Sequence, residues 1–364
     1  ALVAVLDRML AKERRKRFAT PAEVSAALSS FAAGGTPTDR KRTWRRRAFL
    51  TAGVAGIGGA IAYSVWGRPQ TPSPVFAEEL LKLEGHTDAV HSVALIPGNR
   101  AALSCGEDMT VRHWSLETGT LLHTLEGHTD WVAWVVAHPD GRHAISGGRD
   151  RFVMVWDLAT GKRVQRIEAS REPILCVAIS PDGKQLLSAG GTAPVLWNFG
   201  SNTPLRTLEG ANQAWQFIRF VSDNRALGGG DSKQAILWNL DTGRSIVRFP
   251  HEHSVEDGML SDDGTLLYTA CRDRTTRVWD VASGQEVKRM RFDDLPYRVI
   301  VRDGKLLVFC PTYEGLITLR ELELGREVCR FVGHTLATNA VVVDPDARLV
   351  LTGNRDCTVR VWKT

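Results

Sequence analysis

Residues 127–161 read GHTDWVAWVVAHPDGRHAISGGRDRFVMVWDLATG and contain one complete copy of a repeating pattern. A Gly-His pair opens the stretch at Gly127 and His128, and Trp156 stands near its end. Between them, short apolar runs such as RFVMVW alternate with turn sequences such as HPDGR. Such runs, bounded by Gly, Pro and Asp, are typical of short antiparallel β-strands joined by tight turns. The stretch therefore predicts β-structure.

The same pattern recurs along the chain with a period of about 41 residues. Most units end on a Trp, and the last two of these Trp are two periods apart, with the missing one expected near Leu319. Seven units of this length fill residues 78–364. The recurring tryptophans are Trp114, Trp156, Trp197, Trp238, Trp279 and Trp362.

Four of the seven units share a set of polar residues at fixed spacing. A His lies 28 residues before the Trp, an Asp lies 22 residues after the His, and a Ser or Thr lies four residues before the Asp. The sets are His86, Ser104, Asp108 and Trp114; His128, Ser146, Asp150 and Trp156; His251, Thr269, Asp273 and Trp279; and His334, Thr352, Asp356 and Trp362.

These motifs resemble the WD-repeat family, with Gly-His near the start of each unit and Trp-Asp near its end. The resemblance implies an all-β fold, a seven-bladed β-propeller with a four-stranded antiparallel sheet in each blade. It also implies a hydrogen-bonded chain in each complete unit, from Trp through Ser or Thr and His to Asp. Ser, His and Asp also form catalytic triads. Because the set recurs four times at fixed spacing, we expect a structural role.

Three units depart from the pattern. Unit three has Thr192 at the Asp position and no His, and unit four has Ala211 at the His position but keeps Asp231. Unit six lacks the Trp, the His and a clear turn Asp. We expect these blades to be held by packing alone.

The two ends of the repeat array predict how the ring closes. The chain ends directly after Trp362, where other units continue into a further strand. Residues 77–84, AEELLKLE, match that missing strand at the start of the array. We therefore expect them to pair into blade seven, which would protect otherwise open strand edges.

An uncharged run at residues 48–66, AFLTAGVAGIGGAIAYSVW, is long enough to cross a bilayer as a transmembrane helix. A basic juxtamembrane linker, residues 34–47, precedes it, and a Pro-rich linker, residues 67–77, follows. The excess of positive charge before the run places the N-terminus in the cytoplasm and the propeller outside. A buried apolar helix and an export signal cleaved near Ala62, with RRRAFL as a twin-arginine motif, are the alternatives.

Residues 1–33 predict two amphipathic helices, and LDRMLAKERRKRFATPAEVSAAL resembles the last helices of a serine/threonine protein kinase C-lobe. A generic basic amphipathic helix is the alternative. The order of segments is similar to bacterial receptor-type kinases with an exported sensor. The Gly-rich loop, the HRD loop and the DFG motif of kinases are all absent from this sequence, so we expect no enzymatic activity from it.

The family resemblance implies a rigid platform that binds a protein or peptide partner on one face of the propeller. The net positive charge is confined to residues 1–47, with 12 Lys/Arg against 4 Asp/Glu, which argues against nucleic-acid binding by the rest of the chain. We expect no metal and no cofactor, since the six Cys form no CxxC pair. A catalytic propeller of the lyase or quinoprotein type is the alternative. The candidate partner-binding residues are His91, Glu107, Trp131, Arg149, Arg272, Asn339 and Arg355.

Overall fold

A computed structural model describes residues 75–210, 214–302, 305–322, 326–344 and 348–363. The chain divides into two compact units, residues 1–71 and 72–364, and all described residues belong to the second. The predicted kinase-like helices, juxtamembrane linker and membrane span lie outside the described residues. Within the described ranges, the structure contains no helix with the length and apolar character needed to cross a bilayer.

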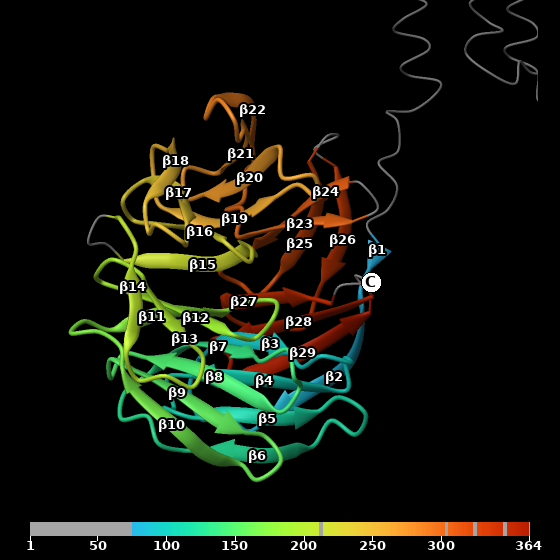
Figure 1. Cartoon of the computed structure of the whole chain (residues 1–364). Coiled ribbons are helices and arrows are strands. Elements are labelled where there is room, and N and C mark those ends of the chain that lie inside the picture. Colours follow the sequence, from blue (N-terminus) through green and yellow to red (C-terminus); the bar gives the residue numbers. More distant parts are fainter. Residues whose placement is uncertain (1–74, 211–213, 303–304, 323–325, 345–347, 364) are drawn as a thin grey trace, which may run out of the picture. The chain divides into compact units, whose positions relative to one another are not determined.

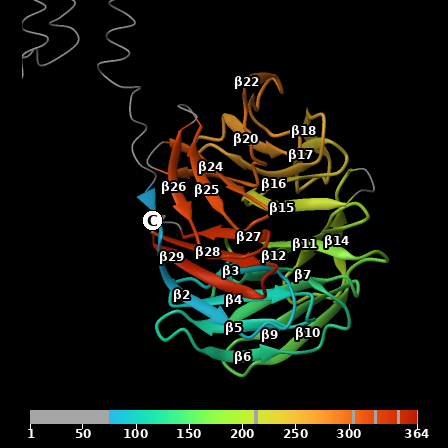
Figure 2. The same ribbon diagram turned by 180° about the vertical axis from the view of Figure 1, so that it is seen from behind.

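The described residues form seven sheets, and each sheet is one blade of a β-propeller (Figure 1). Within a blade, consecutive strands pair antiparallel. In the two opposite views of Figures 1 and 2, the first strands of the blades lie toward the middle and the last strands lie at the periphery. The predicted all-β, seven-bladed propeller is therefore confirmed.

The second strand of each blade is mostly buried, and the first strand lies inside it. The innermost strands are β3 (Val90–Leu95), β7 (Val132–Ala137), β11 (Ile174–Ile179), β15 (Trp215–Ser222), β19 (Val255–Leu260), β23 (Arg298–Arg302) and β27 (Thr338–Val343). The second strands are β4 (Ala101–Gly106), β8 (His143–Gly148), β12 (Gln185–Gly190), β16 (Arg225–Gly230), β20 (Leu266–Cys271), β24 (Lys305–Pro311) and β28 (Leu349–Asn354).

The outermost strand of each blade is the most exposed to solvent, whereas the third strand is largely buried. The third strands are β5 (Val111–Ser115), β9 (Phe152–Asp157), β13 (Val195–Asn198), β17 (Gln234–Asn239), β21 (Thr275–Asp280), β25 (Ile317–Glu321) and β29 (Thr358–Lys363). The outermost strands are β6 (Leu121–Leu125), β10 (Lys162–Glu168), β14 (Pro204–Thr207), β18 (Ser245–Pro250), β22 (Glu286–Arg291), β26 (Glu327–Phe331) and β2 (Glu78–Glu84), with β1 (Val75–Phe76) added beyond β26.

The core of the propeller lies between neighbouring blades. Leu103 and Val111 of blade one, for example, belong to the same buried apolar cluster as Met154 and Trp156 of blade two. Each blade therefore covers the apolar face of the next, and no blade has an independent core. This is why strands β4, β8 and β12, which are covered on both sides, read as nearly continuous apolar or small residues.

The ring closes through the N-terminal strand β2, as predicted. It pairs antiparallel with β29, from Glu78 opposite Lys363 to Glu84 opposite Thr358. In Figure 1 the blue strand β2 accordingly lies beside the red strand β29. Antiparallel pairing here joins the two ends of the array in one sheet, so blade seven has no unpaired third strand.

The strand β1 extends this closure to blade six and was not predicted. Val75 and Phe76 pair in parallel with Cys329 and Arg330 of β26, and the backbone N–H of Ala77 donates to the carbonyl of Arg330 over 2.7 Å. Residues 75–77, which the sequence analysis assigned to the Pro-rich linker, thus belong to the propeller. Their sequence, VFA, is apolar and β-branched at Val75, unlike the Pro-containing stretch before it.

We predict that weakening the closing strand destabilises the whole ring. Leu83 is 1% exposed and packs in the cluster between blades seven and one, whereas Leu80 in the same strand is 42% exposed. Leu83→Ala should therefore lower the free energy of unfolding by about 2–5 kcal/mol, because it leaves a cavity. Urea unfolding followed by tryptophan fluorescence would measure this. Leu80→Ala is the control, and an equal loss in both variants would contradict the prediction.

Candidate functional site

Three blades contain the full hydrogen-bonded chain that the family resemblance implied. In blade two, Trp156 Nε1 donates to Ser146 Oγ over 2.8 Å. Ser146 Oγ lies 2.7 Å from His128 Nε2, and His128 Nδ1 lies 2.9 Å from Asp150 Oδ2. Blades one and seven contain the same contacts, in His86, Ser104, Asp108 and Trp114 and in His334, Thr352, Asp356 and Trp362.

The order of donors along this chain is determined by its two ends. Indole Nε1 can only donate, and an ionised carboxylate can only accept. A neutral His128 must therefore donate from Nδ1 to Asp150 and accept at Nε2 from the hydroxyl of Ser146. Ser146 is fully buried, so its hydroxyl is closed to a substrate. The arrangement joins the turn at Asp150 to the strand that carries Trp156, and its geometry suits a structural role.

The carboxylates at the ends of these chains are stabilised in their charged form. Burial alone would raise the pKa of Asp108, but hydrogen bonds from His86 and Thr110 hold it at about 2. Asp108 also accepts from the backbone N–H of Thr87 at 3.3 Å, which ties the loop before strand β3 to the turn after strand β4. The charged Asp108 therefore holds together two loops at the same end of blade one.

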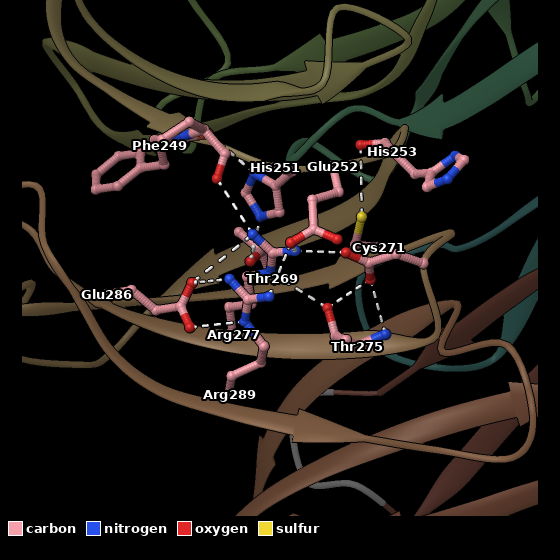
Figure 3. A network of polar contacts seen from close by, with 12 residues as sticks. Phe249, His251, Glu252, His253, Thr269, Cys271, Thr275, Arg277, Glu286 and Arg289 are labelled. Carbon is pink, nitrogen blue, oxygen red and sulfur yellow. Dashed lines mark hydrogen bonds and ion pairs between the residues drawn. The ribbon is translucent and has the colours of Figure 1, made fainter.

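Blade five departs from the predicted arrangement. His251 Nε2 bonds to Thr269 Oγ1 at 2.8 Å, and Trp279 donates to the same hydroxyl, but His251 Nδ1 bonds to the carbonyl of Phe249 at 2.9 Å (Figure 3). The predicted link from His251 to Asp273 is therefore wrong. Burial and then the nearby positive charge of Arg277 lower the pKa of His251 to about 4, so it remains neutral near pH 7.

In blade five, the buried side chain of Arg277 pairs with Asp273, the residue to which His251 does not bond. Arg277 is 2% exposed, and its Nη2 lies 2.5 Å from Asp273 Oδ2 and 3.6 Å from Glu252 Oε1. Its Nη1 lies 3.7 Å from Glu286 Oε2, so three carboxylates surround the guanidinium. Figure 3 shows Glu252, Glu286 and Arg289 gathered around Arg277. Blade five is thus held by ion pairs where blades one, two and seven use His and Asp.

The residue before the His also differs in blade five. Gly85 and Gly127 have φ angles of 151° and 154°, which are accessible to glycine. Pro250 stands at the equivalent position in blade five, and the proline ring locks φ near about −65°. Gly333 of blade seven does not share the positive φ, yet His334 bonds to Asp356, so this angle alone does not decide the partner of the His.

Packing alone does not hold blades three and four, contrary to our expectation. In blade three, Trp197 Nε1 donates to Ser188 Oγ over 2.9 Å, so the Trp–Ser half of the chain persists without the His. In blade four, Trp238 Nε1 donates to the carbonyl of Glu209. A buried indole N–H needs an acceptor, and a backbone carbonyl satisfies that need when the hydroxyl is absent.

The predicted partner-binding residues meet at one end of the central channel. A cavity of about 440 Å³ opens there, and the first strand of every blade contributes at least one residue to its lining. All predicted residues except Glu107 line it, and Glu107 lies directly behind, 3.1 Å from His91 Nε2. The lining residues among the predicted ones are His91, Trp131, Arg149, Arg272, Asn339 and Arg355.

Of the sixteen lining residues, six were predicted from the sequence and ten were missed, among them Trp134, Gln216, Glu256, Tyr297 and Arg298. A simple positional signal identifies most of the inner-strand residues: in six blades the second residue of the innermost strand lines the cavity. These six are His91, Ala133, Leu175, Gln216, Glu256 and Asn339.

An ordered aromatic and cationic cluster forms one side of this channel mouth. The guanidinium carbon of Arg149 lies 4.3 Å from the ring centre of Trp131. The imidazole of His91 contacts the same indole, with ring centres 5.6 Å apart. Trp131 and Trp134 are both half-buried. Stacking of this kind holds a guanidinium in one orientation while its N–H groups remain available.

Deeper contacts in the channel join blades that lack the complete hydrogen-bonded chain. Asp257 of blade five is fully buried and pairs with Arg219 of blade four and, at 3.2 Å, with Arg298 of blade six. Its other oxygen accepts from the backbone N–H of Val299 at 3.1 Å. Arg298 also lies 5.5 Å from the ring centre of Trp134 in blade two. Arg298 therefore extends between blades on different sides of the channel.

Among the described residues, His138, Asp140 and His143 form a group whose ligand atoms lie close enough to hold a metal ion. Both nitrogens of His138 already have partners: Nε2 bonds to the carbonyl of Gly183 at 3.0 Å, and Nδ1 accepts from the backbone N–H of Asp140 at 3.2 Å. Asp140 also accepts from the backbone N–H of Arg142 at 2.7 Å. A metal would have to displace these bonds, so the geometry favours a structural turn.

Radially arranged antiparallel sheets with buried Trp, Ser or Thr, His and Asp chains define a β-propeller built from repeats. The chain belongs to the WD40 family: the family model "WD domain, G-beta repeat" matches residues 77–115, 119–157, 161–198, 244–280 and 325–363, just over half of the chain. Two stretches between matched ranges, 199–243 and 281–324, hold most of units four and six, which lack the complete polar set, whereas unit three lies within the matched range 161–198.

The chain is also similar to individual proteins, among them one that is named as a WD-repeat protein. It is 24% identical to MST50-interacting protein 11 of Pyricularia oryzae and 25% identical to small ribosomal subunit protein RACK1 of Neurospora crassa, in each case over 43% of this chain and 66% of the relative. It is 25% identical to WD repeat-containing protein 18 of Danio rerio, over 47% of this chain and 45% of the relative. The chain thus spans less than two thirds of these relatives.

We predict that the ion-pair cluster of blade five is essential for the stability of that blade. Arg277→Ala would leave Asp273, Glu252 and Glu286 without their shared counter-charge and should cost about 3–5 kcal/mol of unfolding free energy. Arg289 pairs with Glu286 and Glu252 but is 42% exposed, so Arg289→Ala should cost about 1 kcal/mol or less. Urea unfolding of both variants checks this, and similar losses would refute it.

Proposed function

We propose that this protein is a non-catalytic scaffold that binds a protein or peptide partner in the channel mouth. The observation that carries the proposal is the convergence of His91, Trp131, Arg149, Arg272, Asn339 and Arg355 on one cavity. Trp, Arg and Tyr are the side chains that contribute most to binding at protein interfaces, and the cavity is rich in them. Its volume of about 440 Å³ suits one or two side chains of a partner.

The relatives support an interaction role by their names. One is an interacting protein, one is a ribosomal subunit protein, and a fourth relative, 27% identical, is eukaryotic translation initiation factor 3 subunit I of Bombyx mori. Each of these names describes a protein that works within an assembly with others. By analogy, we propose the same type of role for this propeller.

We further propose that the propeller is the extracytoplasmic sensor of a membrane-anchored protein whose N-terminal part resembles a serine/threonine kinase. The support is in the sequence: the uncharged run at residues 48–66 follows six Lys or Arg between residues 40 and 47. A reporter fused after Thr364, with protease protection and carbonate extraction, tests this. A cytosolic reporter would refute the exported location, and a released fragment beginning after Ala62 would favour the cleaved-signal alternative.

We predict that a photo-crosslinking amino acid at Gln216 in the channel mouth captures a defined partner. The same group at Arg100, which lies in the turn at the opposite end of blade one, should not. Trp131→Ala in the Gln216 background should abolish the adduct, because it removes the largest contact surface that the predicted residues offer. Mass spectrometry identifies the adduct, and thermal unfolding verifies the fold. An adduct at Arg100 only, or one unaffected by Trp131→Ala, would refute the assigned site.

A further inference from the structure

The four arginines of the channel mouth differ in whether a carboxylate neutralises them. Arg272 pairs with Glu256 at 2.5 Å, and Arg298 pairs with buried Asp257 at 3.2 Å. Arg149 and Arg355 are exposed, and neither is paired with a carboxylate in the described parts of the chain. The mouth therefore offers two guanidinium groups whose N–H donors are available to a ligand.

These two arginines lie on either side of the same residue. His91 belongs to blade one, and Arg149 and Arg355 come from the adjoining blades two and seven. Burial lowers the pKa of His91, Glu107 opposes this, and the positive charges of Arg149 and Arg355 lower it further. Both arginines line the same cavity as His91. Trp131 stacks on Arg149 and limits its rotation, which reduces the entropy that binding would cost.

The charges around the channel mouth indicate which ligands can bind there. The chain's own residues 1–47 carry 12 Lys/Arg and only 4 Asp/Glu, so like charge disfavours them next to unpaired arginines. Glu107 bonds to His91 at 3.1 Å and Glu256 pairs with Arg272 at 2.5 Å, so two carboxylates lie at the same mouth. Their negative charges oppose a dianion more strongly than a monoanion, which favours a carboxylate over a phosphate.

We infer that the channel mouth binds an acidic segment of a partner protein, with an Asp or Glu carboxylate of that segment held between the guanidinium groups of Arg149 and Arg355. This inference rests on the proposed function and adds the chemistry of the partner. Guanidinium and carboxylate match in a planar, two-pronged geometry, and such charge-assisted bonds are stronger than neutral ones. Because the site is open to solvent, binding weakens as salt concentration rises.

Binding of short labelled peptides to the full chain tests the inference by fluorescence anisotropy. The probes are a peptide of alternating Gly and Glu, its Gln counterpart and its phosphoserine counterpart. We expect the Glu peptide to bind most tightly, the Gln peptide to bind at least roughly ten-fold more weakly, and high salt to reduce binding of the Glu peptide. Arg149→Gln and Arg355→Gln should each weaken binding of the Glu peptide roughly ten-fold or more.

Arg100→Gln is the matched control, since Arg100 is an exposed arginine with a single weak ion pair to Glu117 at 3.6 Å. It should leave binding unchanged, and both mouth variants should unfold at the wild-type temperature because their side chains are exposed. Equal binding of the Glu and Gln peptides, or unchanged binding by both mouth variants, would overturn the inference. Tighter binding of the phosphoserine peptide would overturn the assignment to a carboxylate.

The peptide and crosslinking results separate this inference from the proposed function. If the Glu peptide does not bind but the adduct at Gln216 forms and depends on Trp131, the mouth is a partner site and the inferred acidic chemistry is wrong. If the Glu peptide does not bind and no adduct forms at Gln216, the proposed site itself is wrong. Binding of the Glu peptide that depends on Arg149 and Arg355 supports both.

Discussion

The structure depends on the closure of the ring by strand β2 in the sheet of strand β29. Each blade buries its apolar face only against its neighbours, so an open array would expose the faces of its first and last blades to water. Strand β1 adds a second connection at the same place, because it pairs with blade six before the chain enters blade seven. The channel mouth exists because this closure brings seven inner strands around one axis.

Once the ring is closed, four of the blades position their loops by one of two arrangements of polar side chains. Blades one, two and seven use a His between a buried hydroxyl and an Asp, which satisfies each donor and acceptor in turn. Blade five keeps the His and the Thr but surrounds Arg277 with three carboxylates. Farther inside, Asp257 joins blades four, five and six through two arginines. Charges therefore compensate where the recurring polar set is incomplete, and the rigid frame keeps the mouth residues in place.

Prediction from sequence succeeded where a pattern repeats and failed where a residue acts alone. The period of about 41 residues revealed seven blades, and the strand that closes them was found because residues 77–84 resemble the end of each unit. His251 keeps every spacing of the complete set, yet Arg277 pairs with Asp273 and His251 bonds to the carbonyl of Phe249. Spacing reports which residues are equivalent, but it carries no information on which charged side chain reaches the Asp in space. The missed cavity residues, such as Glu256 and Arg298, have no common residue type, and only their place in the inner strand unites them.

The sequence by itself determined the repeat, the number of blades, the source of the closing strand and the identity of most polar chains, because each follows from local spacing. Tertiary structure alone decided which of the arginines near the channel are neutralised. Arg272 finds Glu256 and Arg298 finds Asp257, while Arg149 rests on Trp131 and Arg355 remains unpaired among the described residues. Asp257, the partner of Arg298, belongs to another blade. Trp131 contacts Arg149 because the turn after strand β8 lies beside the start of strand β7. The physical reason is that charge pairing depends on distance in space, which is settled only when the blades meet around the channel.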